Sequence, residues 1–150
     1  MYVALNINKS MKKLLEKKAG IIPFTNDGKM LFMISSDFNF GGKKANISKG
    51  DVDGNETFLQ AAIREGSEEL GLIPANFLGK PFEVFKGTIK STNTYSIVIY
   101  AVEVKDKKAF NKPHYETKET VWLTNKEFQK TGRKSHRTVV NDIWKVIPNI

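Results

Sequence analysis

The sequence predicts a mixed α/β fold in which a mixed β-sheet is sandwiched between helices. Two kinds of sequence pattern support this fold class. Runs dense in β-branched and aromatic residues are typical of strands, and apolar residues spaced three and four apart are typical of helices that pack on one face. The expected strands are Ala19–Phe24, Met30–Ser35, Phe82–Ile89, Tyr95–Val104 and Thr120–Leu123, and the main expected helices are Thr57–Leu70 and Ser135–Val146.

The length and composition favour one soluble domain. The chain has 150 residues, 40% of them hydrophobic, and no linker or repeat divides it, so we expect a single domain over residues 1–150. It contains no cysteine, which excludes disulfides and thiolate metal sites and is typical of a cytoplasmic protein. No apolar run reaches the roughly 18 residues of a membrane span, and Met1–Lys18 is too polar for a signal peptide. We therefore expect no membrane partner.

The sequence predicts a short amphipathic helix over Lys9–Gly20, which overlaps the start of the first expected strand. The tetrapeptide Thr25–Gly28 contains Asp-Gly between two apolar runs, a strong signal for a β-hairpin. The following segment, Ser36–Asp53, is rich in Gly, Lys, Asn and Asp, which predicts a long loop.

The central helix is well delimited. Thr57 and Gln60 have the spacing of a capping box, and Gly71 follows the last expected helical residue. Beyond the strands that follow, Lys105–Glu119 is expected to be a polar loop. The last helix starts among charged residues that we expect to form a solvated face, namely Arg133, Lys134, His136 and Arg137.

Charge is distributed unevenly along the chain. The net charge is +8, yet Gly50–Leu72 holds six acidic residues and one arginine, a net −5 that leaves +13 elsewhere. On the expected helix, Glu65, Glu68 and Glu69 share one face, separate from an apolar stripe formed by Leu59, Ile63, Gly66 and Leu70. Clustered like charges destabilise a helix unless a cation neutralises them. Oxygen ligands of this kind suit Mg²⁺ or Mn²⁺.

The spacing of this segment resembles the Nudix box. The matching positions are Gly50, Glu56, Arg64-Glu65, Glu68-Glu69 and Gly71-Leu72. The resemblance implies a Nudix fold, an α/β/α sandwich, and a metal bound by Glu65, Glu68, Glu69 and the Gly50 carbonyl, with one carboxylate serving as general base. It also implies a structural ion pair between Glu56 and Arg64 that orients Glu65. Gly66 departs from the family pattern, which has an aliphatic residue there.

Several residues outside the box are candidates for the same site. Nudix enzymes often supply a further carboxylate from a loop, and Glu116 is the first candidate here, with Glu119 second. The approach Ser48-Lys49-Gly50 loosely resembles that of dinucleoside polyphosphate hydrolases, with Ser48 in place of proline. The candidate phosphate-binding residues are Lys43, Lys44 and Lys49, and the candidate rings for stacking on a base are Phe38, Phe40 and Tyr95.

The resemblance implies a metal-dependent pyrophosphohydrolase. Its expected substrate is a small nucleotide with a nucleoside diphosphate linked to another moiety, such as a dinucleoside polyphosphate or an ADP-ribose-like compound, and a nucleoside monophosphate is released. Two alternatives stay open: an enzyme acting on RNA 5′ ends, which the +13 outside the box favours, and a non-catalytic nucleotide- or RNA-binding module. A homodimer is possible, since dimers are common in the family.

Overall fold

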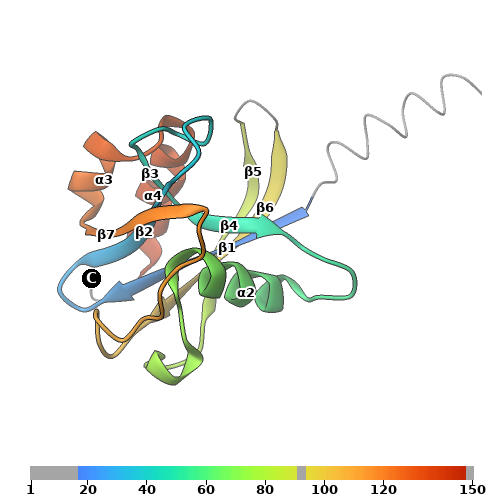
Figure 1. The fold of residues 1–150 in the computed structure, drawn as a ribbon, viewed down its shortest axis with the longest axis vertical. Helices are drawn as coiled ribbons and strands as arrows, with labels where there is room; N and C mark the ends of the chain where they lie inside the picture. The colour runs from blue at the N-terminus through green and yellow to red at the C-terminus, as the bar shows by residue number, and fades with distance from the viewer. Residues whose placement is uncertain (1–16, 91–93, 148–150) are drawn as a thin grey trace, which may run out of the picture.

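The computed structural model describes residues 17–90 and 94–147, and in this part of the chain a seven-stranded sheet lies between helices (Figure 1). The helices are α2 (Phe58–Leu70), a 3₁₀ turn (Pro74–Asn76), α3 (Asn125–Thr131) and α4 (Lys134–Val146). The strands are β1 (Lys17–Thr25), β2 (Lys29–Ser35), β3 (Ala45–Asn46), β4 (Ser48–Asp51), β5 (Phe82–Ile89), β6 (Tyr95–Glu103) and β7 (Thr117–Leu123). No helix in the described ranges is both long and apolar enough to cross a membrane.

The helices cover the two faces of the sheet, as the sequence predicted. On β1, Ile21 packs with Ala62 of α2 on one face, and the next residue, Ile22, packs with Val140 and Ile143 of α4 on the other. This alternation follows from the two-residue period of a strand, and it makes β1 buried on both sides. The fold is therefore the α/β/α sandwich expected from the sequence.

Four expectations about individual elements are wrong or incomplete. Residues 17–20 belong to β1, so the helix predicted over Lys9–Gly20 is wrong there, and the rest of that range lies outside the described residues. The predicted loop Ser36–Asp53 contains β3 and β4. Strand β7 begins at Thr117 rather than Thr120, and the short helix α3 was not predicted.

The two strands of the first hairpin separate soon after their turn. β1 and β2 pair at Phe24–Met30 and Thr25–Lys29, and the turn has Gly28 at φ +85°. The segment 45–51 then lies between the diverging strands, because β3 pairs with β2 and β4 pairs with the first half of β1. Pairing with two different strands gives this short segment its position at the centre of the sheet.

Helix α2 begins and ends as the sequence indicated. The Thr57 hydroxyl accepts a hydrogen bond from the Gln60 backbone N–H at 3.1 Å, and the Gln60 side chain accepts one from the Thr57 N–H at 2.9 Å, which forms a capping box. Gly71 ends the helix in the left-handed conformation at φ +73°. The apolar stripe was predicted incompletely, because Ala61 and Ala62 are fully buried whereas Leu59 is half-buried.

Gly66 sets the distance between α2 and the sheet. A Cβ at this position would lie 2.7 Å from Cγ2 of Ile21 and 3.0 Å from Cδ2 of Leu72. The departure from the family pattern noted in the sequence is therefore a close approach of the helix to β1.

We expect Gly66→Ala to destabilise the protein. Alanine has the better helix propensity by about 1 kcal/mol, but overpacking of a rigid core costs about 1–3 kcal/mol and should outweigh that gain. Urea unfolding monitored by circular dichroism gives the difference. A Gly66→Ala protein more stable than the wild type would contradict this packing.

Candidate functional site

The three glutamates of the acidic face lie at the C-terminal half of α2, against β4. Glu69 is the most deeply placed of them. Its Oε1 accepts a hydrogen bond from the Ser48 hydroxyl at 2.9 Å and another from the Lys49 backbone N–H at 2.8 Å. Burial raises the pKa of Glu69 to about 7, although both hydrogen bonds oppose the increase.

Glu65 lies beside Gly50 of β4. A Cβ at Gly50 would be 2.1 Å from Cδ and Oε1 of Glu65, so glycine is needed for the carboxylate to occupy this place. Burial raises the pKa of Glu65, and the negative charges of Glu68 and Asp51 act in the same direction. The carboxylates thus lie close enough for their negative charges to repel one another, as expected for groups gathered at one site.

Arg64 connects the helix to the loop before it. Its guanidinium donates to both oxygens of Glu56, from Nε at 2.8 Å and from Nη2 at 3.0 Å. The Nη2 group also donates to the Asp51 carbonyl at 2.9 Å, and Nη1 donates to Oε1 of Glu65 at 3.0 Å. The predicted Glu56–Arg64 pair is present. Arg64 also neutralises part of the charge on the acidic face, since Nη1 is 3.5 Å from Glu68.

The loop before β7 closes the end of α2. The backbone N–H groups of Asn111 and His114 donate to the carbonyls of Gly71 and Glu68, at 2.7 and 2.8 Å. The Thr117 hydroxyl donates to the Glu69 carbonyl at 2.8 Å. These bonds satisfy carbonyls that a helix end leaves without partners, and they fix the loop that carries Glu116 to the helix.

A pocket of about 170 Å³ opens beside Glu69. Its charged lining residues are Lys18, Lys49, Arg133, Glu69 and Glu116, and Met33, Phe40 and Ile47 supply apolar surface. Glu116, the predicted extra carboxylate, therefore shares a pocket with Glu69. Lys18 and Arg133 were missed in the sequence, because Lys18 fell in a predicted helix and Arg133 in a predicted solvated face.

Of the other predicted substrate-binding residues, Lys49 lines the pocket, and Lys43, Lys44 and Tyr95 do not. Lys43 and Lys44 are exposed and do not line it. Tyr95 is 6% exposed, and its ring lies under the ammonium groups of Lys18 and Lys49, 5.2 and 5.3 Å from the ring centroid. Burial, with the charge of Lys18 second, lowers the pKa of Lys49 to about 8.

The segment 36–44 borders the pocket and is held at both ends. The Ser36 N–H and hydroxyl donate to the carbonyls of Glu116 and Tyr115, each at 2.9 Å. At the other end, the Asn46 amide donates to the carbonyls of Phe40 and Lys44, at 3.3 and 3.0 Å. Phe40 lines the pocket and is 56% exposed, so its ring is available to a ligand, whereas Phe38 is 84% exposed and does not line the pocket.

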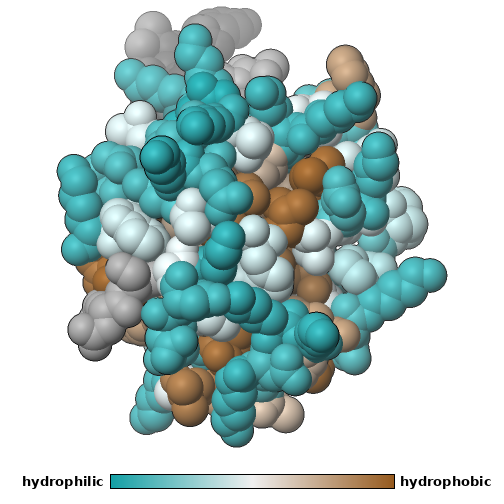
Figure 2. Space-filling view, turned by 90° about the vertical axis from the view of Figure 1, so that its left-hand side faces the viewer, coloured by the Kyte–Doolittle hydropathy of each residue, from teal (hydrophilic) through white to brown (hydrophobic). Residues whose placement is uncertain are grey.

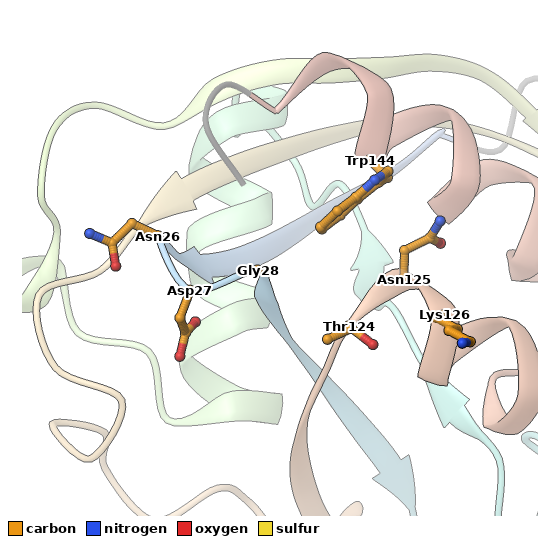
Figure 3. Close-up of a pocket in the computed structure, with 7 residues that line it drawn as sticks. All are labelled: Asn26, Asp27, Gly28, Thr124, Asn125, Lys126 and Trp144. Atoms are coloured by element: carbon orange, nitrogen blue, oxygen red, sulfur yellow. The ribbon is translucent and has the colours of Figure 1, made fainter.

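A second, larger pocket lies elsewhere, between the β1–β2 turn, the start of α3 and α4 (Figure 3). Its volume is about 650 Å³, and Trp144 provides an aromatic wall opposite Gly28. Asp27 is its one acidic lining residue, and a single carboxylate does not suit the binding of a multivalent cation.

One face of the molecule is mostly hydrophilic, with smaller hydrophobic areas between polar side chains (Figure 2).

The acidic site offers oxygen ligands for a divalent cation. Within residues 17–90 and 94–147, no three acidic, histidine or cysteine side chains already converge as a complete ligand set, because Glu69 bonds to β4 and Glu68 approaches Arg64. The donor chemistry nevertheless fits Mg²⁺ or Mn²⁺. The missing side chain at Gly50 lets the Glu65 carboxylate lie against the backbone of β4, and the carboxylates repel one another without a cation.

A comparison of the chain with models of protein families identifies its family. The NUDIX domain model matches residues 14–143. The chain therefore belongs to the Nudix family, a class of hydrolases that act on phosphoanhydride bonds. No curated protein sequence matches the chain significantly.

Solved structures share the fold at low sequence identity. An Ap4A hydrolase from C. elegans, in a binary complex, is 17% identical with a TM-score of 0.70, over 85% of this chain and 94% of that one. The NUDIX domain of NrtR from Shewanella oneidensis, solved with ADP ribose, is 13% identical with a TM-score of 0.70, over 87% and 86%. A NUDIX hydrolase from Nitrosomonas europaea is 17% identical with a TM-score of 0.67, over 87% and 88%.

Proposed function

We propose that this protein is a Mg²⁺- or Mn²⁺-dependent pyrophosphohydrolase that cleaves a nucleoside diphosphate linked to another moiety. The products are a nucleoside monophosphate and the phosphorylated remainder. One observation carries the proposal: the half-buried Glu69 belongs to the acidic face of α2 and also lines a pocket that contains cationic side chains. Cleavage of a diphosphate needs both of these, a metal-binding face and an anion-binding pocket.

The metal ligands proposed are Glu65, Glu68, Glu69 and the carbonyl of Gly50. A bound cation would neutralise the diphosphate and lower the pKa of an attacking water. Arg64 holds Glu65 in place through its bond at 3.0 Å. A carboxylate whose pKa is raised to about 7, as for Glu69, accepts a proton more readily at neutral pH than an ordinary glutamate.

The pocket residues would bind the rest of the substrate. Lys18, Lys49 and Arg133 supply positive charge for the phosphate chain. Phe40 lies at the pocket mouth and is exposed enough to stack on a base. Glu116 lines the same pocket as Glu69 and is proposed as an additional ligand or base. Two of the structurally similar proteins, an Ap4A hydrolase and a NUDIX domain in complex with ADP ribose, are compatible with this substrate class.

A hydrolysis screen tests the proposal. The purified protein is incubated with Ap4A, ADP-ribose, FAD, nucleoside triphosphates and 5′-triphosphorylated RNA, with Mg²⁺, with Mn²⁺ or with EDTA. We expect metal-dependent release of a nucleoside monophosphate from at least one small nucleotide, and no release in EDTA. Turnover of the RNA alone would favour the RNA 5′-end alternative, and turnover that persists in EDTA would contradict the metal site.

A further inference from the structure

His136 is a buried titratable residue to which the proposed chemistry gives no role. It lies in the first turn of α4 and is 0% exposed. Its Nδ1 accepts a hydrogen bond from the Ile47 backbone N–H at 3.2 Å, so the ring proton is on Nε2, which has no partner among the described residues. Burial, and then the charges of Lys49 and Arg133, hold its pKa well below the usual range. The ring is therefore a neutral acceptor.

Ile47 needs an acceptor because of where the strand changes partner. Asn46 pairs with Met33 of β2, whereas Ser48 pairs with Ile21 of β1. Ile47 lies between these two ladders and belongs to neither strand, although it is only 1% exposed. A buried backbone N–H without a partner costs about 1–3 kcal/mol, so the His136 ring replaces the missing ladder bond.

The residues directly after Ile47 contact the reactive carboxylate. The Ser48 hydroxyl and the Lys49 N–H both donate to Oε1 of Glu69. His136 of α4 is thus connected to Glu69 through one hydrogen bond to Ile47 and the two residues that follow it. A shift of Ile47 would move both donors, since the three residues are consecutive in one backbone.

The start of α4 also holds the two residues before Ile47. The Arg133 N–H donates to the Ala45 carbonyl at 2.8 Å, and the Arg133 Nη1 donates to Oδ1 of Asn46 at 3.2 Å. Residues 45, 46 and 47 are therefore each bonded to the same turn of the helix. Among these contacts, the His136 ring is the group that accepts from a backbone N–H of the segment. It does so at Ile47, immediately before Ser48 and Lys49, the two residues that donate to Glu69.

We infer that His136 is a positioning residue for hydrolysis: as the acceptor for Ile47, it holds Ser48 and Lys49 against Glu69. Removal of the acceptor should loosen these donors and displace the carboxylate relative to substrate, while Lys18 and Arg133, the pocket cations outside the segment that carries Ser48 and Lys49, keep their places. The loss should therefore appear mainly in kcat. This inference rests on the proposed function for its kinetic part alone.

Two substitutions separate hydrogen bonding from packing. His136→Phe keeps a ring of similar size but has no acceptor, whereas the side-chain oxygen of His136→Asn can take the place of Nδ1. We expect His136→Phe to lower kcat by about 10- to 100-fold with KM within about threefold, in line with the cost of small displacements of reacting groups. His136→Asn should recover at least about tenfold of that loss. Val140→Ala, a fully buried change on the same helix, is the matched control for lost stability and should keep kcat.

Hydrogen exchange at the Ile47 amide tests the contact without an activity assay. We expect exchange by NMR to be at least about tenfold faster in His136→Phe than in the wild type or in His136→Asn. Unchanged exchange at Ile47, wild-type kcat in a folded His136→Phe protein, or an equal loss of kcat in Val140→Ala would each overturn the inference. If the wild-type protein hydrolyses none of the substrates, the proposed function fails, and the exchange measurement still decides the role of His136 at Ile47.

Discussion

We expect Glu69→Gln to abolish metal-dependent hydrolysis and, at the same time, to make the metal-free protein more stable above pH 7. Loss of the carboxylate removes a proposed metal ligand and proton acceptor, and kcat should fall by about 10²–10⁴-fold. The side chain keeps its shape, so Gln can still accept hydrogen bonds from Ser48 and Lys49, and the fold should be retained.

The gain in stability follows from the raised pKa. The carboxyl has a pKa of about 7 in the folded protein against an ordinary value of 4.5, so between these pH values the folded state binds the proton more tightly than the unfolded chain. The stability of the metal-free wild type should therefore fall as pH rises through this window and stay lower above it. Glutamine carries no charge, and its advantage should be on the order of 2 kcal/mol at pH 8 and close to zero at pH 4.

Urea unfolding in EDTA at pH 4 and pH 8 measures this difference. Glu83→Gln, an exposed change on β5 away from the pocket, is the matched control and should alter neither stability nor activity. Mg²⁺ should stabilise the wild type more than Glu69→Gln, because binding to the folded state raises its stability. A Glu69→Gln protein that keeps wild-type turnover would contradict the assignment of this carboxylate.

Gly50→Ala should be the second severe change. The new Cβ would lie 2.1 Å from the Glu65 carboxylate, and no rotation of a methyl group relieves that overlap. Glu65 must therefore leave its position and its 3.0 Å contact with Arg64. We expect activity to fall by about 100-fold or more, with a loss of about 1–3 kcal/mol in stability.

Gly87→Ala provides the control, because Gly87 is also a strand glycine with an ordinary φ and lies in β5. Its Cβ would meet the edge of the Phe85 ring at 3.1 Å, a side chain that can yield. Activity measured at saturating Mg²⁺, with unfolding curves of both variants, separates the two positions. A Gly50→Ala protein with normal Mg²⁺ dependence and kcat would show that Glu65 needs no room at this glycine.

The sequence predicted the parts of the site that are encoded locally. The Thr57–Gln60 capping box, the Gly71 end and the shared face of Glu65, Glu68 and Glu69 all follow from the geometry of one helix. The hairpin at Gly28 is also local, since it depends on a single turn. Such features need no knowledge of distant residues.

The parts that were missed depend on contacts between distant segments. The strands at 45–51 are too short to have a pattern of their own and form because β1 and β2 diverge around them. Lys18 and Arg133 reach one pocket from opposite ends of the chain, 115 residues apart in the numbering. His136 had one usable signal: it stands four and seven residues before Val140 and Ile143, on the buried face of α4.

The segment 36–44 has a consequence for how this protein could be redesigned. Hydrogen bonds at Ser36 and Asn46 fasten its two ends. The span between them, with Phe38 and Phe40, carries none of the proposed metal ligands. Loop closure changes slowly with length, each doubling costing about 0.6 kcal/mol. We therefore expect that this span can be replaced by loops of other sequence and length. Such loop grafting should alter substrate preference while the acidic helix and β4 keep their geometry.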